Sequence, residues 1–404
     1  MPSVKNVIPV VLLTLALLAP AGAVSPTELG AFLAGRALPP ESVLAPLQQS
    51  DEYREHARLY AAQWFRYDER YFAPMRAWSG SELVMRTGAS RQVTYLFGGP
   101  DLISALALFP EAGSYVLGGL EPVGKLMNPL ELSPEQLHAS LAALRKSTEV
   151  IMSFNHFITK DMKTDLQSSA FPGVFPVMLV FLSFTDTRIT SAERLSLLPD
   201  GSLVHGQDAG GQEALRIVFQ PSPFVPAAEV IYVQADLSDR ALRKNPALLE
   251  WLGRRGPATG YLKAASYLPH SGNFSRVRDF LLANCTAIVQ DDSGIPLAAY
   301  RAAGWRVICF GTYTAPLEIF AKNEQPALRE IYASGAAFPL PFGFGYRWQR
   351  GESTLLLALP PHRPPRALPV INPAASGPLA PYAPGQNSDR GIPHPRSFLR
   401  SPDG

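Results

Sequence analysis

Residues 92–119 read QVTYLFGGPDLISALALFPEAGSYVLGG, and this run indicates the class of fold. It opens with a β-branched and aromatic segment, Val93 to Phe97, which is followed by glycine and proline. A short helical segment, Leu102 to Phe109, separates it from a second apolar strand that begins at Ser114. A strand, a helix and another strand within about 30 residues predict a βαβ unit, in which the two strands are parallel.

The same alternation returns near residue 300. Residues 286–290 predict a strand, a helix through Tyr300 ends at Gly304, and residues 305–310 predict the next strand. Single strands are also predicted at residues 215–219, 229–234 and 261–264. Because strands alternate with helices, the sequence predicts an α/β fold, in which a mostly parallel or mixed sheet is covered by helices on both faces.

The pattern divides the chain into segments on either side of this α/β body, which is expected to span residues 91–358. Residues 24–90 predict a helical N-terminal lead, with an aromatic stripe from Tyr53 to Phe65 at helical spacing. We expect the stripe to pack against the body, because aromatic side chains gain much from burial. Residues 359–404 are rich in proline and poor in apolar residues, so they are predicted to form a disordered tail.

The first 23 residues have the pattern of a secretory signal peptide. Lys5 precedes an apolar run from Val7 to Leu18, and small residues lead to a cleavage point expected after Ala23. The run is shorter than the about 20 apolar residues that span a bilayer, so no transmembrane segment is expected after cleavage. The sequence therefore predicts an exported protein, either periplasmic or secreted.

The composition limits the classes of partner. The chain has 404 residues, of which 47% are hydrophobic and 17% charged, enough to bury a full core. A net charge of +2, with no run of Lys and Arg, argues against a nucleic-acid partner, since binding would need a basic face. A small-molecule or cell-envelope ligand remains open.

Two cysteines, Cys285 and Cys309, follow the predicted cleavage point. Export would permit one disulfide between them. The alternative is a pair of buried free thiols, and the Cα separation that decides between the two cannot be read from the sequence.

Acidic residues follow four of the predicted strands. In open α/β sheets, ligands bind at the carboxyl ends of the strands, beside the point where the strand order reverses. If these strands are parallel neighbours, their carboxylates converge on one edge of the sheet. The residues concerned are Asp101, Glu121, Asp236, Asp291 and Asp292.

Converging carboxylates can bind a divalent metal ion, which is the one cofactor the pattern raises. They can also perform acid/base chemistry, because neighbouring like charges push one pKa upward. The catalytic candidates are Asp291, Asp292, His270 and Lys263, and the ligand-binding candidates are Asp101 and Glu121. In the alternative interpretation, Asp101 only caps a helix and Asp291 and Asp292 only form a turn.

No motif in the sequence specifies a reaction. The loop from Gly98 to Asp101 lacks the glycine spacing of a dinucleotide fingerprint and the Lys-Ser/Thr pair of a P-loop. Gly-x-Ser-x-Gly, the signature of a serine nucleophile, does not occur. Residues 342–348 predict either a final strand that contains glycines and packs on the core or, at Arg347 and Trp348, an aromatic edge for stacking a ligand.

Three segments, residues 97–101, 115–124 and 290–296, resemble a group of exported bacterial proteins to which no activity is assigned. The resemblance covers roughly Tyr53 to Leu357 and leaves out the proline-rich tail. It implies a bacterial origin and export, and it brings no catalytic residues. Two functions therefore stay open: a ligand-binding or envelope-associated protein without catalysis, or a hydrolase-type enzyme that uses carboxylates at strand ends, with or without a divalent metal.

Overall fold

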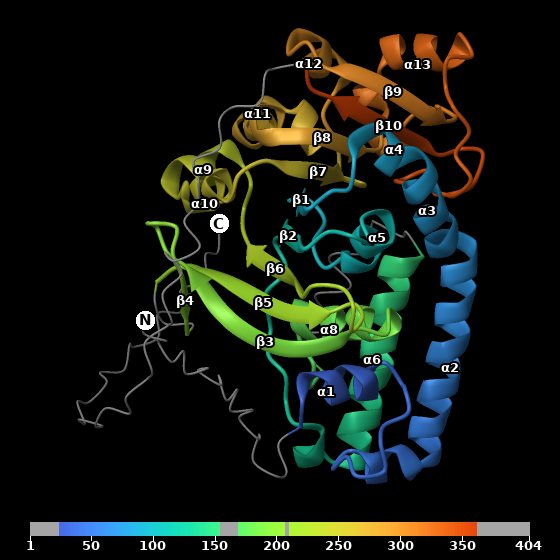
Figure 1. Cartoon of the computed structure of the whole chain (residues 1–404), viewed down its shortest axis with the longest axis vertical. Coiled ribbons are helices and arrows are strands. Elements are labelled where there is room, and N and C mark those ends of the chain that lie inside the picture. The colour runs from blue at the N-terminus through green and yellow to red at the C-terminus, as the bar shows by residue number, and fades with distance from the viewer. Residues whose placement is uncertain (1–23, 154–168, 207–209, 362–404) are drawn as a thin grey trace, which may run out of the picture. The chain divides into compact units, whose positions relative to one another are not determined.

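A ten-stranded mixed sheet runs through the protein, in the order β4-β3-β5-β6-β2-β1-β7-β8-β10-β9 (Figure 1). The computed structural model describes residues 24–153, 169–206 and 210–361. The predicted signal peptide and, from residue 362 on, the predicted tail lie outside the described residues. The strands are β1 (Gln92–Tyr95), β2 (Ser114–Gly119), β3 (Arg188–Leu197), β4 (Leu203–His205), β5 (Gln212–Gln220), β6 (Ala228–Gln234), β7 (Ala258–Leu262), β8 (Cys285–Gln290), β9 (Arg306–Gly311) and β10 (Thr354–Leu359).

The centre of the sheet is parallel, as the sequence predicts. Strands β6, β2, β1, β7 and β8 all run in one direction. From β1 the chain adds β2 and β6 on one side, and it later adds β7 and β8 on the other. The strand order therefore reverses between β1 and β7, and the loops that leave these two strands lie next to each other.

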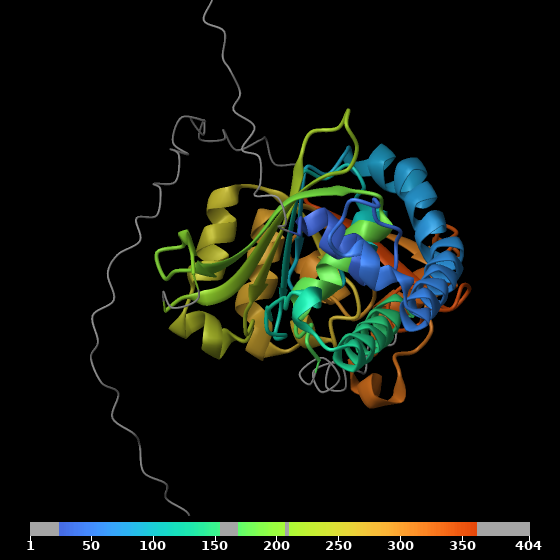
Figure 2. The ribbon, with the colours of Figure 1, turned by 90° about the horizontal axis from the view of Figure 1, so that it is seen from below.

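Helices cover both faces of the sheet, which confirms the predicted fold class (Figure 2). Alternate residues of β2 enter opposite cores: Tyr115 and Leu117 pack on one face and Val116 on the other. This double burial is why the central strands read as continuous apolar runs. The α-helices are α1 (Pro26–Leu33), α2 (Asp51–Tyr67), α3 (Ala73–Trp78), α4 (Val84–Thr87), α5 (Leu102–Leu108), α6 (Pro134–Met152), α8 (Val174–Phe184), α9 (Asp239–Lys244), α10 (Ala247–Arg255), α11 (Ser275–Asn284), α12 (Leu297–Ala302) and α13 (Pro326–Ala333).

The helical lead packs on the body through Tyr60 and Trp64 of its aromatic stripe, as predicted, but Phe65 at the end of the stripe is 69% exposed. Helix α2 begins after Ser50, whose hydroxyl accepts a hydrogen bond from the amide of Tyr53. On α8, the ring of Phe184 meets Tyr60 edge-on at 5.3 Å and stacks on Trp64 at 4.6 Å. Within the described residues, no helix combines the length and the apolar character needed to cross a membrane.

The predicted second βαβ unit is wrong in one respect. Strands β8 and β9 do point the same way, but β10 lies between them and pairs antiparallel with both. The final strand is β10, not residues 342–348, where only a single bridge joins Phe344 to Arg347. Cys285 on β8 and Cys309 on β9 are both buried. They are free thiols, because β10 separates their strands.

Candidate functional site

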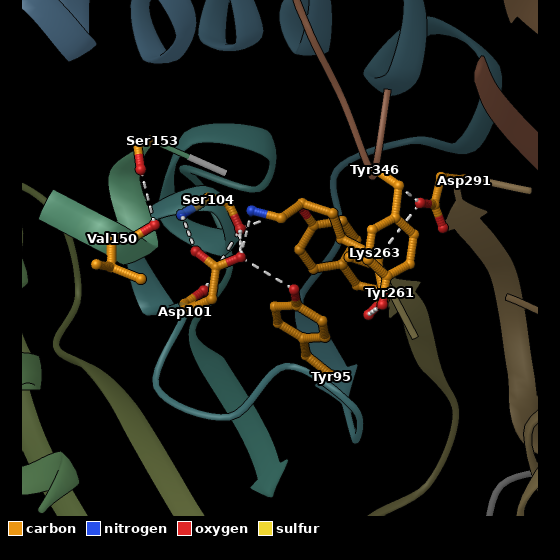
Figure 3. Close-up of polar contacts among 10 residues, drawn as sticks. Tyr95, Asp101, Ser104, Val150, Ser153, Tyr261, Lys263, Asp291 and Tyr346 are labelled. Carbon is orange, nitrogen blue, oxygen red and sulfur yellow. Dashed lines mark hydrogen bonds and ion pairs between the residues drawn. The ribbon is translucent and has the colours of Figure 1, made fainter. Parts of the chain in front are cut away.

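A buried ion pair joins the loops that leave β1 and β7. Lys263 follows the last residue of β7 directly, and its Nζ lies 2.5 Å from Oδ2 of Asp101 (Figure 3). The two residues are only 3% and 6% exposed, respectively. Removing either partner of such a pair strongly destabilises the protein, because the other partner is left as an uncompensated buried charge.

Asp101 is held by neutral donors as well as by Lys263. The hydroxyl of Ser104 donates to its Oδ2 at 2.6 Å, and the hydroxyl of Tyr95 donates at 3.0 Å. Asp101 also caps α5, since it accepts a hydrogen bond from the Ser104 amide. Tyr261 extends the network by donating to the Ser104 hydroxyl. The predicted capping role of Asp101 is confirmed, and the same side chain pairs with a buried cation.

The loop after β7 has an unusual backbone. Ala264, Ser266 and Tyr267 all have φ near +52 or +53°, and they are three of the four described non-glycine residues in the left-handed region. Such residues cost free energy and persist only where the surroundings fix them. Here the loop after β8 does so: Oδ2 of Asp291 accepts from the Ala264 amide at 3.3 Å, and Oδ2 of Asp292 accepts from the Tyr267 hydroxyl at 2.6 Å.

Asp291 is almost fully buried and is surrounded by donors. Besides the Ala264 amide, it accepts hydrogen bonds from the amides of Tyr346 and Ser293 and from the Ser293 hydroxyl. Burial raises its pKa to about 6, although these hydrogen bonds act in the opposite direction. Gly345 lies against the carboxylate, so close that a Cβ there would be 2.2 Å from Oδ2.

Asp292 is the more readily protonated member of the pair. Burial and, next, the neighbouring charge of Asp291 raise its pKa to about 7. In the described part of the chain, Asp292 accepts one side-chain hydrogen bond, from the hydroxyl of Tyr267, whereas four donors surround Asp291. Near neutral pH the two carboxyls therefore favour sharing one proton, and the larger number of donors around Asp291 favours the ionised form there.

His270 lies close to this pair, on the 3-10 turn Leu268–His270. Its ring meets the ring of Tyr267 edge-on at 5.2 Å, and its Nε2 has no hydrogen-bond partner in the described part of the chain. Burial lowers its pKa to about 4, so the ring is neutral at neutral pH. The ring thus contacts the tyrosine that holds Asp292.

Glu121 leaves the carboxyl end of β2 and is buried, with 8% exposed. The hydroxyl of Tyr232 donates to its backbone oxygen at 2.8 Å and reaches Oε2 at 3.4 Å. Its carboxylate lies against Gly99 in the loop after β1. Asp236 differs from the other predicted acids, because it is exposed and only accepts from the Ser238 amide in the loop before α9.

The structure thus brings together the residues after β1, β7 and β8, and it places Glu121 against the first of these loops. Tyr267, Gly345 and Tyr346 also belong to the site, and sequence reasoning missed them. Across residues 24–153, 169–206 and 210–361, no group of three His, Cys, Asp or Glu side chains is arranged to hold a metal ion.

Comparison with family models, curated proteins and solved structures finds no match to this chain.

Proposed function

We propose that this protein is exported and that it binds a small polar ligand at the carboxyl edge of β1, β7 and β8. The observation that carries the proposal is the loop from Lys263 to Tyr267, which leaves β7 where the strand order reverses. Three of its residues hold a costly left-handed backbone; carboxylates of the next loop bind Ala264 and Tyr267, and the hydroxyl of Tyr346 bonds to that of Ser266. Strain of this kind clusters at ligand sites, and doubly wound sheets bind ligands at this position.

The buried polar groups support the same proposal. Asp101 with Lys263, and Asp291 with Asp292, are charged or protonatable groups placed beneath neighbouring strand ends. A protein under selection for stability alone gains little from such groups, because apolar residues of similar volume are often as stabilising. A recognition role accounts for their retention.

The test is the small-molecule content of protein purified from its native host. Mass spectrometry of the denatured protein should detect a compound that the wild type retains and that Asp292→Asn loses. Asp236→Asn is the matched control, because Asp236 is an exposed loop residue at the same edge of the sheet. An identical compound profile for all three proteins would reject the proposed site.

One observation favours a second candidate, a hydrolase-type enzyme without a metal. The raised pKa values of Asp291 and Asp292 leave an ionised and a protonated carboxyl side by side near neutral pH. Such a pair can supply a general base and a general acid to one substrate. Asp292 would protonate the leaving group, and Asp291 would accept a proton from the attacking water.

A panel of chromogenic esters and glycosides tests this candidate. Hydrolysis should follow a bell-shaped pH profile that Asp292→Asn abolishes and Asp236→Asn leaves unchanged. Hydrolysis that is absent, or equal in both variants, removes the enzyme from consideration and leaves the binding function as it stands.

A further inference from the structure

Glu121 is a buried carboxylate without a counter-charge. Two other acids of the described chain have ionic partners: the buried Asp101 pairs with Lys263, and the half-buried Glu229 pairs with Arg216 and Arg255. Glu121 forms no ion pair within the described residues. Among the described residues, the one hydrogen-bond donor to its carboxylate is the Tyr232 hydroxyl, 3.4 Å from Oε2, and that hydroxyl already donates to the Glu121 backbone oxygen at 2.8 Å.

Two glycines form the wall around this carboxylate. A Cβ on Gly119 would lie 2.4 Å from Oε2, and one on Gly99 would lie 3.0 Å from the same atom. The chain therefore keeps bare backbone on both sides of Oε2, where larger residues would displace the carboxylate. The next residue toward the strand, Leu120, is 56% exposed, so the carboxylate lies close to the surface of the molecule.

The energetic argument follows from burial. An ionised carboxylate taken out of water is costly unless a cation or several donors compensate it, and the described residues supply neither to Glu121. A ligand that brings the missing positive charge would remove this cost on binding. Because Gly119 and the Tyr232 hydroxyl lie beside Oε2, we infer that a ligand would bond to one oxygen, which suits a compact ammonium rather than a planar guanidinium that prefers two parallel hydrogen bonds.

We propose that Glu121 binds the ammonium group of the ligand, which makes the ligand of this site an alkyl amine. This inference rests on the proposed ligand-binding function and specifies the class of ligand. Glu121 lies against the loop after β1, so an amine anchored there extends along the same loop that carries Asp101.

The experiment compares wild type with Glu121→Gln, which keeps the shape of the side chain and removes its charge. Butylammonium at pH 7.5 is the probe, because an alkyl amine is fully protonated there, and n-butanol is the neutral control. We expect butylammonium to raise the melting temperature of the wild type and to bind Glu121→Gln about 10- to 100-fold more weakly. Glu111→Gln, at an exposed glutamate, should behave as wild type.

A second readout needs no ligand. Removing an uncompensated buried charge should make unliganded Glu121→Gln more stable than wild type, with a melting temperature about 2–4 °C higher. A purely structural glutamate would give a loss instead.

The amine assignment is overturned if butylammonium stabilises wild type and Glu121→Gln equally, stabilises neither, or is matched by n-butanol. It is also overturned if the compound that Asp292→Asn loses carries no amino group. In that last case the proposed binding function stands and only the class of ligand is wrong.

Discussion

At the scale of single residues, the surroundings of Asp291 and Asp292 favour opposite protonation states. Four donors face Asp291, which suits an ionised carboxylate, whereas Asp292 has one and sits beside a like charge. The same type of substitution should therefore have opposite effects at two adjacent positions.

We expect Asp292→Asn to stabilise the protein at pH 8. The folded-state pKa of Asp292 is raised to about 7 from a usual 3.8. The contribution of its protonated form to the free energy of unfolding is therefore fully present below about pH 4 and is lost as the pH rises through about 7. The amide keeps an acceptor for Tyr267 and carries no charge. Urea unfolding should show a gain on the order of 1–3 kcal/mol at pH 8 that disappears near pH 4. A gain that is independent of pH would contradict this account.

Asp291→Asn should destabilise the protein at every pH. An amide NH₂ would replace one oxygen and face amide donors of Ala264 and Tyr346 or of Ser293, which leaves buried groups unsatisfied. The expected loss is about 2–4 kcal/mol, measured by the same urea unfolding. A variant as stable as Asp292→Asn would show that the donors around Asp291 do not matter.

Acid stability depends on a different residue, His56 on α2. Burial and, to a smaller extent, Arg145 on α6 and His138 lower its pKa from 6.5 to about 4, although the hydrogen bond to Leu33 acts in the opposite direction. Its Nε2 bonds to the Leu33 carbonyl, while Nδ1 has no partner among the described residues. The contribution of neutral His56 to the free energy of unfolding is thus fully present above about pH 6.5 and is lost as the pH falls toward 4.

His56→Gln should flatten this acid dependence, since the Gln amide can still donate to the Leu33 carbonyl and does not titrate. Melting curves between pH 7 and pH 4 measure the slope for wild type and variant. His205→Gln, at an exposed histidine, is the control and should retain the wild-type slope. Equal slopes for wild type and His56→Gln would assign acid sensitivity to another group.

At the scale of elements, the segment between α13 and β10 forms one wall of the site. It has no regular structure where Gly345 and Tyr346 meet Asp291, yet its backbone must approach that carboxylate closely. Gly345 has a φ of +69°, which side chains rarely adopt, and the space for a Cβ is already filled.

Comparing Gly345→Ala with Gly335→Ala separates the cost of the left-handed backbone from the cost of the steric clash. Gly335 has a similar φ of +74°, but nothing lies within 4 Å of the position of a Cβ. Gly335→Ala should cost about 1 kcal/mol from the backbone alone. Gly345→Ala should cost about 2–4 kcal/mol, because the methyl group also displaces Asp291. Equal losses in urea unfolding would mean that the close approach at Asp291 is easily relaxed.

The elements also show what a sequence can predict. The runs that became β1, β2, β6 and β8 are apolar and punctuated by glycine or polar turns, so their strand character was evident. Strand β3 was missed, because residues 188–194 alternate neither in polarity nor in size and are mostly half-exposed at the margin of the sheet. Strand β10 was also missed, because the final strand was expected at residues 342–348, and its inserted position depends on pairings that its own residues do not encode.

At the scale of the whole molecule, the candidate site was predictable where it follows from topology. Acids directly after parallel strands had to lie on one edge, and Asp101, Asp291 and Asp292 do, with Lys263 between them along the sheet. The pairing of Lys263 with Asp101 was not predictable, because the two are far apart in the chain. Tyr346 was out of reach for the same reason, lying 55 residues from the Asp291 that it contacts.

The place of β10 has a consequence for biosynthesis. It is the last strand of the described chain, yet it occupies an interior position between β8 and β9. Until residues 354–359 have left the ribosome, those two strands have no shared partner, and each presents unpaired backbone groups. A nascent or truncated chain that lacks these residues therefore stays incomplete and aggregation-prone, and the native sheet is finished only after residues 354–359 have emerged.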